Sequence, residues 1–267
     1  MLIDTIVTDL DDTLLGPDTA FTDYTLRVVE RCKQKGIRII PASGRTRTSM
    51  HRFVVQLDTG LPYIAGNGSE IVGPDHRLMR QLTLDETTAR EICRFFAQHG
   101  FYAQVYTNEC IYHGPQQPLR EYYHVSTSMK EVEVGDLCAF LNFPTPKILS
   151  IAHPEAVQQL LPLANAQFEG RASFTVSKPY FLEAEPPGAT KGEALCDLAQ
   201  MIGIDPERTA VFGDSLNDLS MLAFTRHSVA MGNARSEVRA AAAHVCRPNA
   251  EDGLARFVEE HILPAYA

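Results

Sequence analysis

Residues 1–15 read MLIDTIVTDLDDTLL, and this stretch decides the fold. Residues 2–8 form a short apolar run rich in β-branched side chains, and the run stops at a cluster of acids. This pattern predicts a buried strand that ends in a loop. Residues 22–35 follow with apolar side chains at helical spacing. The chain is therefore expected to begin with a strand, a loop and a helix.

The same alternation continues downstream and returns near the other end of the chain. The further elements expected are strands at 37–41, 63–65, 209–212, 228–231 and 244–246, and helices at 46–57, 192–202, 217–223 and 236–242. Strands that alternate with helices predict a parallel sheet covered on both faces. The fold class is therefore expected to be α/β, with a sheet built from both ends of the chain.

The middle of the chain has a different pattern of expected helices and strands. Helices are expected at 85–99 and 154–167, among alternating strand-like segments at 101–106, 147–152, 172–177 and 180–185. This predicts an inserted α+β domain with hairpins. The expected organisation is a core from 1–82 and 187–267, with a second domain from 83–186.

Composition limits the possible partners and locations. The chain has 267 residues, 45% of them hydrophobic, and a net charge of −9. This charge argues against a nucleic-acid or anionic-membrane surface, because both polyanions would be repelled. No stretch approaches the roughly 18 apolar residues of a membrane span. The six cysteines lie singly and the N-terminus lacks signal-peptide features, so a cytoplasmic protein with reduced thiols is expected.

Acidic residues follow two of the expected strands, where ligands of parallel α/β sheets bind. Asp9 and Asp11 end the first strand, and in extended backbone their carboxylates would point the same way. Such a pair is unfavourable without a cation or a proton. Asp214 and Asp218 follow the strand at 209–212, and their oxygens suit a hard cation such as magnesium. Alternatively, Asp218 only complements a helix dipole.

Two further places fit an anionic ligand. Ser43 and Gly44 follow the second strand and lead into a helix, so they could form a phosphate seat, although Ser43 could equally be an ordinary helix cap. Lys191 stands at the start of a helix, where the macrodipole disfavours a cation and a compensating anion is expected. Without its context, a surface lysine would be the better interpretation.

Taken in order, these motifs resemble the haloacid dehalogenase superfamily. The motifs are DLDDT at 9–13, SGR at 43–45, a lone lysine at 191 after a long insert, and GDSLND at 213–218. The similarity extends to AGNGS at 65–69, AMGNA at 230–234 and EDGLA at 251–255. The position and mixed texture of the insert look like the type IIB cap of the Cof-type phosphatases.

The resemblance implies a Rossmann-like core, bound Mg²⁺ and an aspartyl-phosphate intermediate. Asp9 would be the nucleophile and a metal ligand, and Asp11 the acid/base that also offers its backbone carbonyl to the metal. Ser43, Gly44 and Lys191 would hold the phosphoryl group. Asp214 would bind the metal, with Asp218 and Asn217 completing or orienting the metal shell.

Three residues are candidates for facing the substrate, namely Arg45, Asn67 and Asn217. Arg45 could equally pair with a carboxylate, and Asn67 could simply make an Asn-Gly turn. In the insert, the aromatic and histidine cluster could line a substrate pocket, but core packing is the commoner role of such residues. The cluster comprises Tyr102, Tyr106, Tyr112, His113, Tyr122, Tyr123 and His124.

The function that the resemblance implies is a magnesium-dependent phosphatase acting on a small-molecule phosphate ester such as a sugar phosphate. Two alternatives stay open. A phosphomutase has the same core and returns the phosphoryl group to a sugar. A metabolite-binding regulator would have lost turnover, but it has no need for both Asp9 and Asp11. Neither the substrate nor the oligomeric state follows from the sequence.

Overall fold

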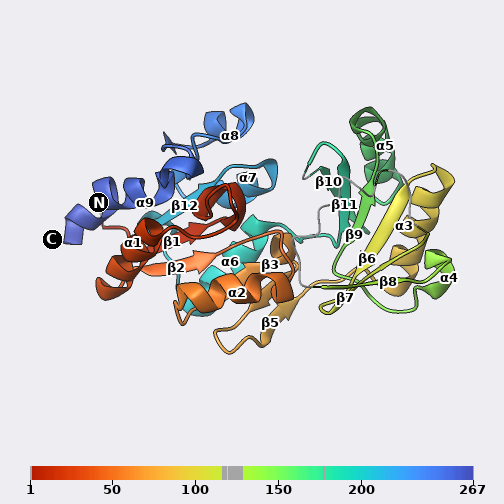
Figure 1. Cartoon of the computed structure of the whole chain (residues 1–267), viewed down its shortest axis with the longest axis horizontal. Coiled ribbons are helices and arrows are strands. Elements are labelled where there is room, and N and C mark those ends of the chain that lie inside the picture. The colour runs from red at the N-terminus through yellow and green to blue at the C-terminus, as the bar shows by residue number, and fades with distance from the viewer. Residues whose placement is uncertain (1, 116–118, 120–128, 177, 267) are drawn as a thin grey trace. The chain divides into compact units, whose positions relative to one another are not determined.

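The computed structural model describes residues 2–115, 119, 129–176 and 178–266. The chain divides into two compact units, coloured along the chain in Figure 1. The first, here called the core unit, comprises Met1–Arg45, Met50–Arg80 and Thr190–Ala267. The second, here called the cap unit, comprises Thr46–Ser49 and Gln81–Ala189.

The core unit is built on a five-stranded sheet with the order β14-β13-β12-β1-β2. All its strand pairs are parallel. Its strands are β1 (Thr5–Thr8), β2 (Arg38–Pro41), β12 (Thr209–Gly213), β13 (Ser228–Ala230) and β14 (His244–Val245). Every residue of β1 is buried, as expected for a strand with neighbours on both edges and helices on both faces. The predicted α/β fold with a parallel sheet is confirmed.

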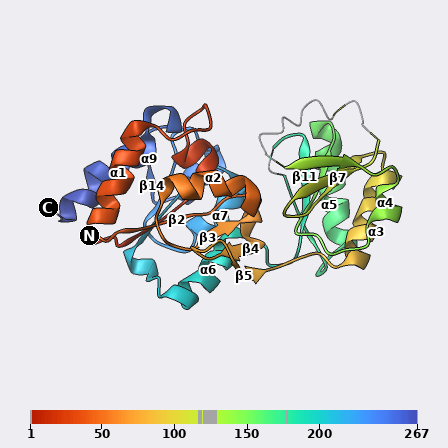
Figure 2. The ribbon, with the colours of Figure 1, turned by 60° about the horizontal axis from the view of Figure 1, so that its bottom comes forward.

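Helices lie on both sides of this sheet, as Figure 2 shows for α1 and α9 on one side and α6 on the other. The helices of the core unit are α1 (Asp23–Gln34), α2 (Arg47–Leu57, whose first turn falls in the cap unit), α6 (Lys191–Ile202), α7 (Leu219–Leu222), α8 (Ser236–Ala241) and α9 (Gly253–Phe257). Ile6 and Ile39 of the sheet line one small cavity with Val28 of α1 and Leu254 of α9. One face of the sheet is therefore packed against α1 and α9.

The strand register brings three chain segments to one edge of the sheet. Thr8 pairs with Pro41 on one side and with Phe212 on the other. Because the strands are parallel, the residues that follow them leave the sheet at the same end. Asp9, Ser43 and Asp214 therefore start from neighbouring positions, although up to 205 positions separate them in the sequence.

A small sheet has the order β3-β4-β5, and β3 pairs antiparallel with β4. Its strands are β3 (Tyr63–Ala65), β4 (Glu70–Val72) and β5 (Leu78–Gln81). An isolated parallel bridge between Ala42 and Ile64 continues the pairing of β2 onto β3. Of these three strands, only β3 was expected from the sequence.

The cap unit contains a six-stranded sheet with the order β10-β11-β9-β6-β7-β8. Its strands are β6 (Tyr102–Tyr106), β7 (Cys110–His113), β8 (Lys130–Glu133), β9 (Ile148–Ile151), β10 (Ser173–Val176) and β11 (Phe181–Glu185). The pairs are antiparallel except for β7 with β8. Its helices are α3 (Glu86–Gln98), α4 (Leu137–Phe140) and α5 (Pro154–Gln167). The expected inserted α+β domain is confirmed, whereas β7, β8 and α4 were not anticipated.

The aromatic cluster of the insert is only partly described. Tyr102, Tyr106 and His113 are buried. Tyr122, Tyr123 and His124, which belong to the same expected cluster, lie outside the described residues. Across the part of the chain that the structure describes, no helix is both long and apolar enough to cross a membrane.

Candidate active site

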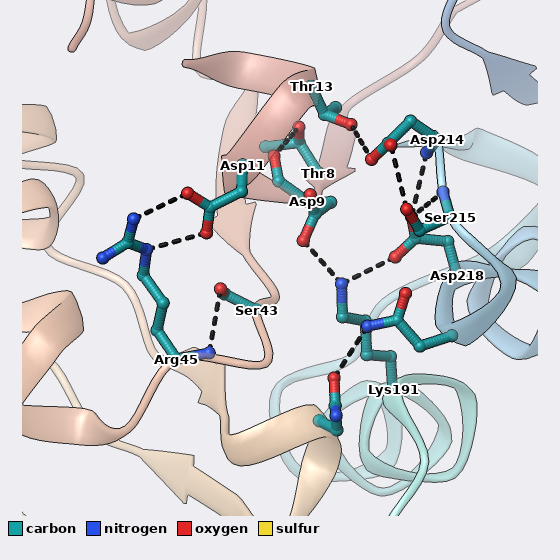
Figure 3. Close-up of polar contacts among 12 residues, drawn as sticks. Thr8, Asp9, Asp11, Thr13, Ser43, Arg45, Lys191, Asp214, Ser215 and Asp218 are labelled. Atoms are coloured by element: carbon teal, nitrogen blue, oxygen red, sulfur yellow. Dashed lines mark hydrogen bonds and ion pairs between the residues drawn. The ribbon is translucent and has the colours of Figure 1, made fainter. Parts of the chain in front are cut away.

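The site is a group of buried polar side chains at the carboxyl edge of the core sheet (Figure 3). Asp9 follows β1 and is 5% exposed, and Asp214 follows β12 and is 8% exposed. The backbone N–H of Asp9 donates to the carbonyl of Phe212 at 3.1 Å, which fixes the end of β1 beside β12. Burial raises the pKa of Asp9 well above its ordinary value, with repulsion from Asp218 and Asp214 adding to the shift and Lys191 opposing it.

Lys191 supplies the buried cation of the site. It is the first residue of α6 and is 1% exposed. Its Nζ lies 2.5 Å from Oδ1 of Asp9 and 2.6 Å from Oδ1 of Asp218. Burial alone would lower the pKa of Lys191, but the carboxylates of Asp218 and Asp9 outweigh burial and raise it. The expectation that Lys191 requires a compensating anion at this helix start is confirmed.

Asp218 is the most fully hydrogen-bonded carboxylate of the group. Its Oδ2 accepts hydrogen bonds of 2.9 Å from the backbone N–H groups of both Asp214 and Ser215. Its Oδ1 accepts from Lys191, and the residue is 0% exposed. Asp218 thus caps the turn after β12 and, at the same time, positions the Lys191 ammonium.

Asp214 is held by two hydroxyl groups. Oγ1 of Thr13 donates to Oδ1 of Asp214 at 3.1 Å, and Oγ of Ser215 donates to Oδ2 at 2.9 Å. Burial raises the pKa of Asp214 to about 6, with the nearby charge of Asp218 adding to the shift. A carboxylate that is costly to ionise in the free protein is well suited to accept a cation.

The carboxylates fit a divalent metal ion. Asp9, Asp214 and Asp218 each offer an oxygen such that these atoms lie within 4.8 Å of one another. With all three ionised and only Lys191 to offset them, the group carries two uncompensated negative charges. Carboxylate oxygens are the ligands that Mg²⁺ prefers, and a divalent cation would balance this excess. Of the four expected metal residues, Asp11 is absent from this group of side chains among the described residues.

The Asp11 carboxylate turns toward Arg45 whereas that of Asp9 turns toward Lys191 (Figure 3), so the expectation of two carboxylates side by side is wrong. Its oxygens accept from Nε and Nη2 of Arg45 at 2.7 and 2.6 Å. Asp9 and Asp11 both have extended φ and ψ angles, but Leu10 between them begins the turn that forms over Leu10–Leu14. Of the two interpretations of Arg45, pairing with a carboxylate is the one that the structure shows.

The loops after β2 and β3 are tied together around Ser43. Ser43 is 1% exposed, and its Oγ accepts from the backbone N–H of Arg45 at 3.1 Å. Asn67 donates its backbone N–H to the carbonyl of Ser43 at 3.0 Å and accepts at Oδ1 from Nδ2 of Asn217 at 2.8 Å. Its φ is 54°, consistent with the expected Asn-Gly turn. A Cβ on Gly44 would lie 2.7 Å from Oδ1 of Asn67.

Two residues of the site, Thr13 and Ser215, were given no role from the sequence. Both lie inside the motifs DLDDT and GDSLND, but nothing in the sequence pattern predicts a role for their hydroxyl groups. Their contribution follows only from the contacts with Asp214, which join residues 201 positions apart in the case of Thr13.

Comparison with known proteins identifies the family of the chain. The family model of the haloacid dehalogenase-like hydrolases matches residues 6–258. A 5-amino-6-(5-phospho-D-ribitylamino)uracil phosphatase of Bacillus subtilis is 26% identical over 98% of this chain and 99% of its own length. An HMP-PP phosphatase of Cronobacter sakazakii is 26% identical over 89% of this chain and 87% of its own length.

A solved structure gives the same result. A haloacid dehalogenase-like hydrolase from Bacteroides thetaiotaomicron is 27% identical, with a TM-score of 0.86 over 97% of this chain and 99% of its own. The expected family and enzyme class are thereby confirmed. The chain belongs to the haloacid dehalogenase-like hydrolases, among their phosphatases.

Proposed function

We propose that this protein is a magnesium-dependent phosphomonoesterase that transfers the phosphoryl group of a small metabolite to Asp9 and then to water. The observation that carries the proposal is the contact of 2.5 Å between Asp9 and the buried ammonium of Lys191, beside a second acid, Asp214. A nucleophile, a fixed cation and a cation-binding carboxylate thus meet at one sheet edge.

Asp9 faces an electrostatic obstacle in this reaction, because its carboxylate and the phosphate ester are both anionic. Lys191 lies against Asp9 and provides positive charge where the phosphate oxygens would arrive. Magnesium, when bound by Asp9 and Asp214 with the backbone carbonyl of Asp11, would supply two further positive charges. Asp218, whose oxygens already accept three hydrogen bonds, would hold Lys191 and the turn rather than the metal directly.

Asp11 is assigned the proton transfers. In the first step its proton passes to the ester oxygen as the bond from that oxygen to phosphorus breaks and the bond from Asp9 to phosphorus forms. In the second step its carboxylate takes a proton from water, whose oxygen replaces Asp9 on phosphorus. An exposed carboxyl is appropriate here, because the alcohol must leave and water must enter; the Asp11 side chain is 43% exposed.

Ser43 and Gly44 are assigned to the phosphate seat. The hydroxyl of Ser43 is buried at the end of β2, in the same edge of the sheet as Asp9. Asn67 leaves no room for a side chain at position 44, and we assign the bare backbone of Gly44 to contact the anion. Asn67 and Asn217 hold each other in this structure, and we assign them to shaping the loop at the substrate side of the site.

The substrate class proposed is a small phosphorylated metabolite. Relatives of equal identity are named for different substrates, a phosphorylated ribitylaminouracil and HMP-PP, so neither name transfers to this chain by similarity alone. We assign residues 83–186 to a cap domain that would select the substrate, and a cytoplasmic location remains a prediction.

The test is phosphate release from a panel of esters that includes sugar phosphates and the two relatives' substrates. Each ester is assayed with chelator and with about 5 mM Mg²⁺, a concentration above the dissociation constants of typical weak metal sites. Wild-type protein should release phosphate only with the metal, and Asp9→Asn should release none. Transfer of the phosphoryl group to a second hydroxyl of a sugar phosphate, without free phosphate, would show a mutase instead. Binding without turnover of any ester would show a regulator.

A further inference from the structure

Arg45 and Asp11 form a bidentate ion pair within the core unit. Nε of Arg45 donates to Oδ2 of Asp11 at 2.7 Å, and Nη2 donates to Oδ1 at 2.6 Å. Figure 3 shows the guanidinium and the carboxylate facing each other edge to edge. Two parallel hydrogen bonds fix the direction of the carboxylate plane, whereas a single contact would leave it free to rotate.

Arg45 is itself held firmly. Its side chain is 11% exposed, and its guanidinium carbon lies 5.0 Å from the centre of the Phe53 ring. Its backbone N–H donates to Oγ of Ser43, and its carbonyl accepts from the N–H of Gly66 at 2.8 Å. The guanidinium therefore starts from a fixed backbone and rests on a buried ring.

Asp11 has little other restraint. Its side chain is 43% exposed, and within the described residues both hydrogen bonds that the structure gives to its carboxylate come from Arg45. It also lies in the turn after β1, next to Asp12 with a φ of 58°. An exposed aspartate on a turn would sample several rotamers, and only a fraction of them would place the carboxyl for proton transfer.

We propose that Arg45 is a positioning residue for the acid/base Asp11: it holds the ionised carboxylate by both hydrogen bonds and, once one oxygen is protonated, holds the other oxygen by a single one, without contact with the substrate. The proposal rests on the phosphatase function above and assigns to Arg45 the selection of one Asp11 rotamer. Arg45 would thus influence proton delivery to the departing alcohol without taking part in phosphate binding.

This role has a specific kinetic signature. The parameter kcat/KM reports the steps up to the departure of the alcohol. A poor leaving group needs a proton from Asp11, whereas p-nitrophenolate departs readily without one. Loss of a positioning residue should therefore slow phenyl phosphate far more than p-nitrophenyl phosphate. Loss of a substrate contact would slow both esters alike, because the two are nearly the same shape.

The experiment compares kcat/KM for phenyl phosphate and p-nitrophenyl phosphate in wild type, Arg45→Met, Arg45→Lys and Arg52→Met. Arg52→Met is the matched control, because its guanidinium lies 4.4 Å from the same Phe53 ring but on an exposed residue. For Arg45→Met, kcat/KM should fall by about tenfold or more further with phenyl phosphate than with p-nitrophenyl phosphate. This difference is part of the rate enhancement that a general acid contributes. Arg45→Lys should recover little, because an ammonium cannot make the fork, and Arg52→Met should leave the ratio unchanged.

Both esters are measured on one preparation, so any unfolded fraction cancels in the ratio. In an Asp11→Asn background, adding Arg45→Met should change kcat/KM less than twofold, since the residue through which Arg45 acts is gone. Equal losses with the two esters, or a full additional loss in the Asp11→Asn background, would overturn the proposal. If wild-type protein hydrolyses neither ester nor any member of the panel, the phosphatase function fails first and independently.

Discussion

The ammonium of Lys191 and the carboxylate of Asp218 lie 2.6 Å apart, with side chains 1% and 0% exposed. The backbone N–H groups of Asp214 and Ser215 hold the other oxygen of Asp218. The first residue of α6 is thereby tied to the turn after β12. The pair places a cation beside Asp9 that water cannot screen, since effective charge interactions strengthen as the surroundings become less polar.

Removing the ammonium should leave buried carboxylates without a partner. Lys191→Met is expected to lower the free energy of unfolding by about 3 kcal/mol or more in chelator, the usual cost of breaking a buried ion pair on one side. Lys130→Met, on an exposed residue of β8, is the control and should change it by less than about 0.5 kcal/mol. Urea unfolding at neutral pH measures both. Equal stability of the two variants would contradict the buried-pair account.

Asp214 should make the metal-free protein less stable as the pH rises. Its pKa of about 6 lies above the ordinary value of an unfolded aspartate, so the folded state binds the proton more tightly. Its contribution is therefore favourable below about pH 4 and is lost as the pH rises through about 6. Asp214→Asn, which can retain both hydroxyl contacts, should melt a few degrees above wild type at pH 8 in chelator and not at pH 4.

Added Mg²⁺ should reverse the order of the melting temperatures of wild type and Asp214→Asn at pH 8. It should raise the melting temperature of wild-type protein at pH 8, because the cation binds only the folded state, and should not raise that of Asp214→Asn. If Asp214→Asn is less stable than wild type in chelator at pH 8, then ionised Asp214 does not destabilise the metal-free protein.

Thr13 should tune metal affinity through Asp214. Thr13→Val keeps the shape but removes the hydroxyl that donates to Oδ1 of Asp214 at 3.1 Å. The Mg²⁺ concentration for half-maximal activity is expected to rise about tenfold, as is usual when a partner of a metal ligand is lost. Thr13→Ser retains the hydroxyl and should stay within about twofold of wild type. Identical metal titrations for Val and Ser would remove Thr13 from the account.

The loop between β3 and β4 packs against the start of α6, and this close approach should require the glycine at position 68. A Cβ at Gly68 would lie 2.2 Å from the carbonyl oxygen of Thr190, the residue before Lys191. Gly68→Ala is expected to cost about 2 kcal/mol more than Gly36→Ala, the excess being overpacking against backbone together with the strain of a φ of +102° in an alanine. Gly36 is the matched control, because its φ of +72° is also positive but nothing lies within 4 Å of its Cβ position. Thermal unfolding of both variants decides the point, and equal costs would contradict it.

Much of the site could be predicted from the sequence because parallel strands end at one sheet edge. The apolar runs at 2–8 and 209–212 are clear, and the acids that follow them, Asp9 and Asp214, had to meet if those runs paired in parallel. The position of Lys191 at a helix start likewise pointed to a nearby anion. These inferences depend on strand and helix periodicity, which is local and strong.

The direction of the Asp11 side chain could not be predicted in the same way. It depends on the turn at Leu10–Leu14, where backbone angles depart from those of a strand, and on Arg45 from another segment. The strands β4, β5, β7 and β8 were also missed; β5 and β8 are largely exposed, so burial imposes no apolar pattern on their sequences. Contacts between distant segments, such as Thr13 with Asp214, form only when the chain folds and leave no local pattern in the sequence.

The central claim is that Asp9 is the nucleophile, and trapping the phosphorylated protein tests it most directly. Asp11→Asn, which lacks the base for the second step, is mixed with p-nitrophenyl phosphate and Mg²⁺, quenched in acid, digested and analysed by mass spectrometry. The account predicts one added phosphoryl group on the peptide that contains Asp9, and none when Asp9→Asn is also present. A phosphoryl group on any other residue, or turnover that continues in Asp9→Asn, would contradict it.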